Sequence, residues 1–343
     1  MGLSRFPPVA SIVLATGGLL LLGWIGWSTL EPFGHTVTVP YRYQLVAKGG
    51  IDQFPELGLQ QADLSINKYE VRSDEIGEPL ATLHVGTRQG TDHTGPVLLD
   101  WHNQLAEPLI TLSPPITEVS ALVKAVEAHL PQGALVLGWW DTTRRLALLT
   151  DVDTPFHKNL SQPVLLPTVW NGHREAIEEF ERNFWGVPRD GTTTAHAVFE
   201  RLQAALLTDK VAGAAALREL AGGRDAYLVL HVADAYKLGV LNQERFGIGY
   251  RDFPNSGNLH SVIGHIKKWL DDNGYESYTV EKLSGTSVRV YFLTETQSQQ
   301  TLIAQALPFT TSQPLELETL KVVYQHKGYW VYRISAERGD KDS

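Results

Sequence analysis

Hydrophobic and polar positions along the chain form one long apolar run, several short alternating segments and several stretches of helical spacing. After the apolar run, short β-branched or alternating segments lie between Gly, Pro and Asp residues, which is typical of strands. They predict strands at 41–48, 62–72, 79–87 and 96–101, then a helix at 117–130, then strands at 134–140 and 144–150. We therefore expect an α+β unit over residues 41–150.

The middle of the chain changes to helical spacing. Residues 151–172 are interrupted by prolines and predict a surface connection, and residues 173–223 predict a block of helices. In the first of these, Ile177, Phe180 and Phe184 recur at the spacing of one helix face. Residues 151–223 are therefore expected to be a connection followed by a helical insert between two α+β units.

Strands and helices alternate again over residues 224–335. The pattern predicts a buried strand at 225–232, a long polar loop at 233–258, a helix at 259–273, a hairpin over 275–294, a short helix at 297–307 and a hairpin over 319–334. This β-α-β-β-α-β order with one added strand is similar to a ferredoxin-like unit. The polar residues 336–343 predict a disordered tail.

The apolar run is Val9–Leu30, which carries no charged residue. At ~1.5 Å per residue, a helix of this length covers roughly 33 Å, enough to cross a bilayer. Arg5 precedes it and Glu31 follows it, so the positive-inside rule places residues 1–8 in the cytoplasm, a transmembrane anchor at 9–30, a linker at 31–40 and the rest outside. The alternatives are a cleaved signal peptide, although no A-x-A follows, and a buried core helix.

Composition excludes several kinds of cofactor. The chain of 343 residues has no Cys, and its one Met is Met1. Covalent haem, iron–sulfur clusters, disulfides and a Met axial ligand are therefore excluded, and we expect no bound cofactor. The net charge of −9, without a cluster of Lys or Arg, argues against a nucleic-acid partner.

The predicted strand and loop at 225–260 gather the side chains best suited to chemistry. Candidate ligand-binding residues are His231, Asp234, Tyr250, Asp252, Asn258 and His260. The histidines and aspartates among them offer nitrogen and oxygen ligands that suit Zn, Fe, Cu or Mn, although no residue is assigned to a metal. A small-ligand or acid–base role is a second interpretation. In a third, His231 is a core histidine and Asp234 caps the next turn.

A second candidate is the sequence Trp139-Trp140-Asp141. In a strand, successive side chains face opposite sides, so one Trp would enter the core and the other would face solvent or a partner. An exposed Trp beside a charged group is a reasonable docking site. The alternative is that this Trp packs under another element.

Four segments resemble the HaoB family, named hydroxylamine oxidation protein. They are WWDTTRRLALLTD (139–151), YLVLHVADAYKLG (227–239), RFGIGYRDFPNSGNLH (245–260) and YESYTVEKLSGTSVRVYFLT (275–294). Members of that family are encoded beside the octahaem hydroxylamine oxidoreductase of ammonia-oxidising and some methane-oxidising bacteria. The resemblance implies a single-pass inner-membrane protein whose bulk lies in the periplasm.

The resemblance also implies a role in hydroxylamine oxidation, but it assigns no catalytic residues. Our first hypothesis is an accessory protein that assembles, tethers or docks the multihaem hydroxylamine oxidoreductase or an associated cytochrome. A second is a haem-free enzyme or small-ligand-binding domain that uses the His231–His260 region, with or without a metal. A third is a structural membrane-associated module without a direct role in nitrogen chemistry.

Overall fold

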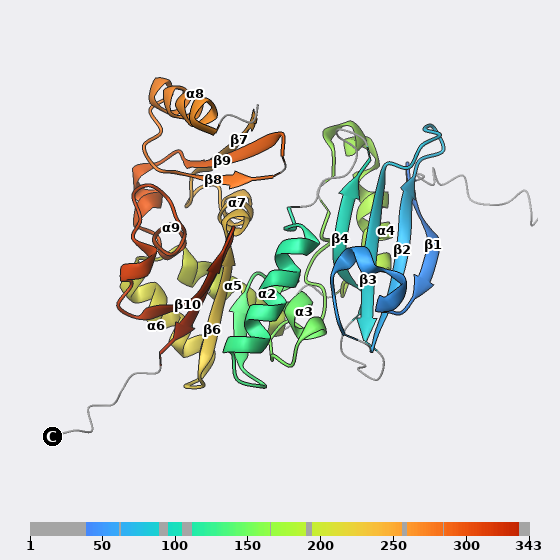
Figure 1. The fold of residues 1–343 in the computed structure, drawn as a ribbon, viewed down its shortest axis with the longest axis horizontal. Coiled ribbons are helices and arrows are strands. Elements are labelled where there is room, and N and C mark those ends of the chain that lie inside the picture. The colour runs from blue at the N-terminus through green and yellow to red at the C-terminus, as the bar shows by residue number, and fades with distance from the viewer. Residues whose placement is uncertain are drawn as a thin grey trace, which may run out of the picture. The chain divides into compact units, whose positions relative to one another are not determined.

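Three β-sheets and the helices around them make up the described part of the chain (Figure 1). The computed structural model describes residues 39–61, 63–88, 95–104, 112–164, 166–189, 194–255, 259–283 and 285–335. Within these ranges no helix has the length and apolar character of a membrane span. The predicted anchor at 9–30, its flanks at 1–8 and 31–38, and the tail at 336–343 lie outside them. Contacts divide the chain into residues 1–39 and a compact unit of residues 40–343.

The first sheet is an antiparallel meander in the order β1-β2-β3-β4. Its strands are those predicted from the alternating pattern, namely β1 (Arg42–Gly49), β2 (Leu64–Arg72), β3 (Ala81–Arg88) and β4 (Val97–Asn103). Leu64 and Ile66 of β2 enter a shared core on one face. Helix α4 (Arg174–Trp185) covers the aromatic residues of the other face, where the rings of Tyr43 and Phe184 lie 4.1 Å apart.

A carboxylate is buried under α4. Glu181 is fully buried and accepts hydrogen bonds from the hydroxyls of Tyr41 and Tyr43 and, at 2.7 Å, from Nε1 of Trp185. Burial raises the pKa of Glu181 above its ordinary value, although the three donated hydrogen bonds oppose this shift. The helix is therefore attached to the sheet by a polar contact inside an aromatic layer.

The second sheet has the order β10-β11-β6-β5 and is covered on both faces. Its strands are β5 (Leu135–Gly138), β6 (Ala226–His231), β10 (Leu320–His326) and β11 (Tyr329–Ile334). Only β5 and β6 run parallel. Leu228 and Leu230 enter one core and Tyr227 and Val229 enter the other, because successive side chains of a strand face opposite sides. Since β5 pairs with β6, this sheet joins the predicted 41–150 and 224–335 units.

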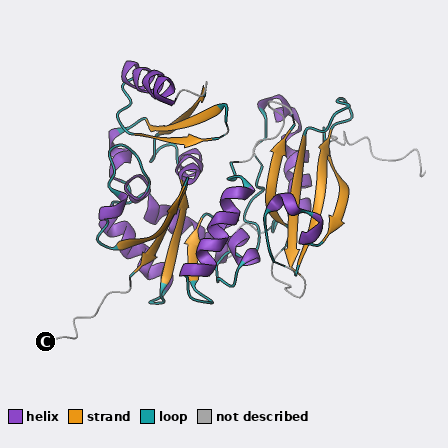
Figure 2. Ribbon diagram, in the orientation of Figure 1, coloured by secondary structure: helices purple, strands orange, loops and turns teal. Residues whose placement is uncertain are grey.

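Helices fill the space on each side of this sheet (Figure 2). One side holds α2 (Ile116–His129) and α3 (Trp140–Leu149), which also contact the first sheet or its loops. The other side holds α5 (Thr194–Leu206), α6 (Lys210–Ala221), α7 (Val232–Leu241) and α9 (Leu302–Ala306). The predicted helical block is thus confirmed as α4, α5 and α6.

The third sheet is small and antiparallel, in the order β7-β9-β8. It consists of β7 (Ile248–Pro254), β8 (Tyr278–Lys282) and β9 (Ser287–Leu293), with α8 (Leu259–Asp272) on one face. The α+β class is confirmed, but the ferredoxin-like arrangement is wrong. In that fold β6 would share a sheet with β8 and β9, whereas here it pairs with β5 and β11.

Two local predictions are also wrong. The predicted strand at 144–150 belongs to helix α3, which lies between two sheets and buries nearly all its sides, so its apolar residues show no helical face. The predicted loop at 233–258 contains α7 and β7. Its polar residues obscured the helix because two of them, Asp234 and Lys237, are buried in an ion pair.

Candidate functional site

His231 ends β6 and begins α7 with a reciprocal cap. Its Nδ1 accepts a hydrogen bond from the backbone N–H of Ala233 at 3.1 Å. The carboxylate of Asp234 accepts one from the backbone N–H of His231 at 2.9 Å. These bonds satisfy N–H groups that a helix start leaves open. The interpretation in which Asp234 caps the next turn is therefore the one that the structure shows.

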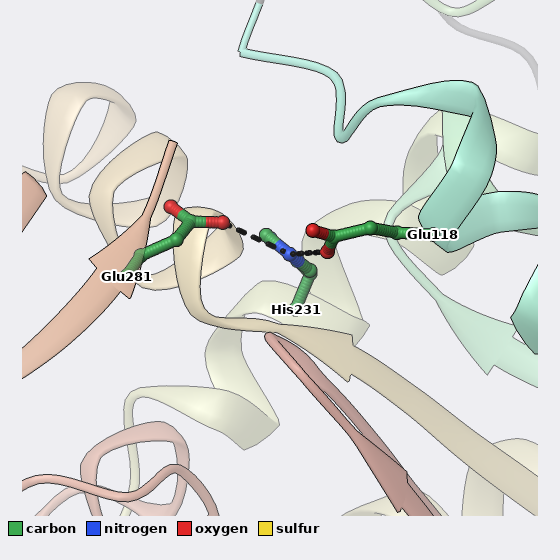
Figure 3. Close-up of side chains that lie close together, drawn as sticks. All are labelled: Glu118, His231 and Glu281. Atoms are coloured by element: carbon green, nitrogen blue, oxygen red, sulfur yellow. Dashed lines mark ion pairs between the residues drawn. The ribbon is translucent and has the colours of Figure 1, made fainter. Parts of the chain in front are cut away.

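The other nitrogen of the same ring faces two carboxylates (Figure 3). Nε2 of His231 lies 3.3 Å from Oε1 of Glu281 on β8 and 3.6 Å from Oε2 of Glu118 in the first turn of α2. His231 is 1% exposed, and 10% of the Glu281 side chain is exposed. Nζ of Lys327 lies 3.4 Å from the other oxygen of Glu118. Three elements far apart in the sequence thus meet at one imidazole.

The two carboxylates differ in their affinity for a proton. Burial alone would raise the pKa of Glu118, but His231 and Lys327 outweigh it and lower that pKa. Burial and the nearby charge of Glu118 raise the pKa of Glu281, although His231 opposes them. An ionised carboxylate and a more readily protonated one therefore lie on either side of a histidine. This arrangement places two carboxylates of different proton affinity next to one imidazole, which is a geometry suited to acid–base chemistry.

The same cluster has the composition of a metal site. Ligand atoms of Glu118, His231 and Glu281 all lie within 4.8 Å of one another. However, the Nδ1 lone pair of His231 already accepts the Ala233 N–H, so the proton of the neutral ring is on Nε2. A metal at Nε2 needs a lone pair there. The capped imidazole therefore presents an N–H to the carboxylates and does not fit a metal at this position.

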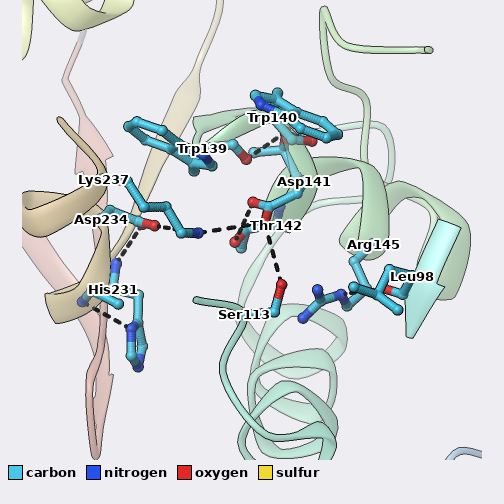
Figure 4. Close-up of polar contacts among 12 residues, drawn as sticks. Leu98, Ser113, Trp139, Trp140, Asp141, Thr142, Arg145, His231, Asp234 and Lys237 are labelled. Carbon is cyan, nitrogen blue, oxygen red and sulfur yellow. Dashed lines mark hydrogen bonds and ion pairs between the residues drawn. The ribbon is translucent and has the colours of Figure 1, made fainter. Parts of the chain in front are cut away.

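A second polar cluster lies one turn further along α7 (Figure 4). Nζ of Lys237 lies 3.1 Å from Oδ1 of Asp234 and 3.4 Å from Oδ2 of Asp141, at the start of α3. Burial would lower the pKa of Lys237, but the two aspartates raise it. Burial would raise the pKa of Asp141, but Lys237 and Arg145 lower it. Both members of this buried pair are therefore held in their charged forms.

Lys237 and Asp141 line a cavity of about 260 Å³, together with Trp139, Trp140 and Phe199. The prediction that one of the two tryptophans faces solvent is wrong, because each is 6% exposed. The chain turns from β5 into α3 at this point, so the strand alternation assumed for the pair does not apply. Both side chains instead form walls of the cavity.

The remaining predicted residues do not join His231. Asp252 on β7 forms a two-bond ion pair with Arg289 on β9, at 2.7 and 2.8 Å. Tyr250 on the same strand lies 4.2 Å, ring centroid to guanidinium carbon, from Arg289. Asn258 and the side chain of His260 lie outside the described residues. Of the predicted ligand-binding set, the described contacts therefore bring together His231 and Asp234.

Sequence reasoning missed Glu118 and Glu281 as neighbours of His231. Nothing local marks them, because they come from α2 and β8 and meet β6 only through the tertiary fold. For Lys237, the sequence contains a signal that could have identified it as a partner of Asp234. Its separation of three residues from Asp234 is the spacing of a helical ion pair, and it becomes informative once residues 232–241 are treated as a helix.

Comparison with known proteins adds one positive finding. Residues 3–334 match the family described as HaoA-associated protein HaoB. No curated protein and no solved structure matches the chain. The resemblance carried by the four sequence segments is confirmed, and the match extends over the apolar run as well as the three sheets.

Proposed function

The chain belongs to the family of the HaoA-associated protein HaoB, and we propose that it is a haem-free accessory protein that binds HaoA, the hydroxylamine oxidoreductase. The observation that carries this proposal is the family match over residues 3–334. The lack of any Cys supports the haem-free part, because covalent c-type haem requires cysteine thiols. Electron transfer through covalent haem is then the task of the partner.

We propose further that residues 9–30 anchor the protein in the inner membrane and that the unit of residues 40–343 lies in the periplasm. The uncharged run is long enough to span a bilayer, and Arg5 precedes it. An anchored accessory protein would hold the oxidoreductase, or one of its cytochromes, at the membrane surface. Tethering is therefore the accessory role that these features favour.

Co-purification tests the association. Full-length tagged protein is solubilised in mild detergent from cells that express the oxidoreductase, and haem absorbance is followed in the eluate. We expect the multihaem protein to elute with the tagged chain. A chain that elutes alone, while the oxidoreductase is present in the same extract, would remove the proposal. Omitting the tag gives the background.

Fractionation tests the anchor separately. The full chain is expected in the membrane fraction, and proteolysis from the periplasmic side is expected to degrade residues 40–343. A variant without residues 9–30, exported by a cleavable signal, is expected in the soluble periplasm. If the natural N-terminus is absent from the mature protein, the segment is a cleaved signal and the tethering role fails. Binding to the oxidoreductase is then still open to the first test.

One observation favours a second candidate function, a haem-free enzyme. Glu118 and Glu281 lie on either side of the buried Nε2 of His231, and their pKa values are shifted in opposite directions. Such a pair is suited to acid–base work on a small nitrogen compound. Consumption of hydroxylamine by the purified chain, with an added electron acceptor and no oxidoreductase, is the test. Activity that disappears in Glu281→Gln would support it, and no consumption at all would exclude hydroxylamine as its substrate.

A further inference from the structure

The cavity beside Lys237 has an apolar interior and an open mouth. Trp139, Trp140 and Phe199 contribute aromatic walls, and Val240 and Leu241 lie where α7 reaches the surface. Leu241 is 59% exposed although it is apolar and lines the same cavity. The space is therefore continuous with solvent and is distinct from a packing gap in the core.

Lys237 is one of the polar residues that line this cavity, the others being Ser113, Asp141, Ser161, Gln162 and His196. Its ammonium has three N–H donors, and the carboxylates of Asp234 and Asp141 account for two of them. Nζ also lies 5.4 Å from the centroid of the Trp139 ring. Both carboxylates and the ring hold the ammonium in place, so a donor is available to the cavity without further ordering of the side chain.

The charges beside the cavity compensate one another. The ammonium of Lys237 pairs with both Asp141 and Asp234, and the buried Arg144 and Arg145 also interact electrostatically with Asp141. Asp141 also accepts hydrogen bonds from the backbone N–H of Thr142 at 2.6 Å and from its hydroxyl at 3.3 Å. A charged ligand would be desolvated here without a counter-charge, which is unfavourable. The site is therefore suited to a neutral molecule that accepts a hydrogen bond.

The shape of the cavity further restricts the class of ligand that it can bind. The rings of Trp139 and Phe199 meet edge to face, with centroids 5.1 Å apart and planes at 87°. The volume of about 260 Å³ is near the lower end of ligand pockets, which begin at ~300 Å³. We propose that this cavity binds a small, neutral, planar aromatic compound whose ring carries a carbonyl, and that Lys237 donates a hydrogen bond to that carbonyl.

A matched series of probes tests the proposal on the full-length chain in lipid nanodiscs, with empty nanodiscs as the blank. The probes are 1-indanone, indane without the carbonyl and 1-aminoindane with a positive charge, each measured by equilibrium dialysis. We expect saturable binding of 1-indanone at least tenfold tighter than that of either relative, since tenfold is ~1.4 kcal/mol and one hydrogen bond to a charged group supplies about that. Equal binding of indane, tighter binding of 1-aminoindane, or no saturable binding of 1-indanone would each overturn the proposal.

Two variants locate the site. Leu241→Trp fills the mouth and is expected to abolish 1-indanone binding, whereas Leu315→Trp, at an apolar residue that is 75% exposed and does not line the cavity, is expected to leave it unchanged. Lys237→Met is expected to weaken 1-indanone at least tenfold and indane little. Lys237→Met also removes a buried charge. If that variant does not fold, the result for Leu241→Trp decides whether the cavity is the binding site. Unchanged binding in Leu241→Trp would place the ligand elsewhere and refute the assignment.

Discussion

Gly328 lies directly against the imidazole of His231. A Cβ added at Gly328 would come within 2.7 Å of Cδ2 and 2.8 Å of Cε1 of that ring, and closer still to Nε2. The ring has no room to move, because Glu118 and Glu281 lie on the side of Nε2 and the Tyr329 ring is 4.7 Å away, centroid to centroid. Glycine at position 328 is therefore required for His231 to lie between Glu118 and Glu281.

We therefore expect Gly328→Ala to destabilise the protein by about 1–3 kcal/mol, the usual range for overpacking a filled core. Chemical denaturation monitored by tryptophan fluorescence measures the loss. Gly77→Ala is the control, since a Cβ at Gly77 meets nothing within 4 Å. Equal stability of the two variants would mean that the ring is not held against Gly328.

Replacing Lys237 is expected to lower the stability of the protein more than Gly328→Ala does. Lys237→Met leaves Asp141 and Asp234 buried without their cation, and breaking such a pair typically costs about 3–5 kcal/mol. The pKa of Asp141, now lowered mainly by Lys237 against the effect of burial, should then rise above its unfolded value. The folded variant would bind the proton more tightly than the unfolded chain, so its stability should fall as pH rises from about 4 to 7.

A double variant serves as the control for this charge pair. In the Lys237→Met background, Asp141→Asn removes one of the uncompensated charges and should recover part of the stability. A coupling free energy of at least ~1 kcal/mol between the two substitutions is expected for groups in direct contact. Additive losses would show that the two side chains do not interact.

Elements with a clear one-sided pattern were predictable from the sequence. Helix α8 is an example, because Val262, Ile266 and Leu270 recur at helical spacing and enter one core, and Gly274 follows with a φ of 73°. Helix α3 was not predictable in this way. Arg144 and Arg145 donate to the backbone carbonyls of Gly95 and Leu98, so even its charged residues are buried and its sides look alike in the sequence.

In the candidate site, too, the contacts within one segment were predictable and the contacts between distant segments were not. The cap formed by His231 and Asp234 is local, because both residues lie at the start of the same helix. An acidic side chain at the third position of a helix is a recognisable part of such a cap. Glu118 and Glu281 reach His231 only because α2 and the third sheet pack at the same end of β6. The pairing of strands that are distant in the sequence, here β5 with β6, determines which elements meet at the end of β6. No local pattern in a single sequence encodes this pairing.

Glu181 gives the protein a pH dependence with a definite sign. Burial raises its pKa, despite the hydrogen bonds from Tyr41, Tyr43 and Trp185, so the folded chain holds the proton to higher pH than the unfolded chain. Its contribution to stability is thus greatest below the unfolded pKa of about 4.3 and decreases as pH rises through the folded pKa. Glu181→Gln should remove this decrease. Denaturation midpoints of wild type and variant are compared from pH 4 to 8.

The matched control for Glu181 is Glu178→Gln on the same helix. Glu178 is partly exposed and pairs with Arg174 at 3.7 Å. An exposed pair of this kind contributes about 0.3–0.5 kcal/mol, so the pH profile of Glu178→Gln should follow that of wild type. If Glu181→Gln and wild type have parallel profiles, the buried carboxyl does not titrate differently in the folded state.

Two substitutions of His231 separate its capping role from its contacts with the carboxylates. Asn at the N-cap of a helix accepts a backbone N–H as the imidazole Nδ1 of His231 does, whereas Ala does not. Both substitutions remove Nε2 from Glu118 and Glu281. We therefore expect His231→Ala to be less stable than His231→Asn by about 1 kcal/mol, with faster hydrogen exchange in the first turn of α7.

The same pair of variants decides between a cap and a metal ligand. If Nδ1 is committed to the Ala233 N–H, zinc has no lone pair to bind at Nε2, and millimolar Zn²⁺ should not raise the melting temperature of wild type relative to His231→Asn. Equal stability of His231→Asn and His231→Ala, together with a zinc-dependent increase confined to wild type, would contradict the cap. The Nε2 lone pair would then be free, and Glu118, His231 and Glu281 would act as metal ligands.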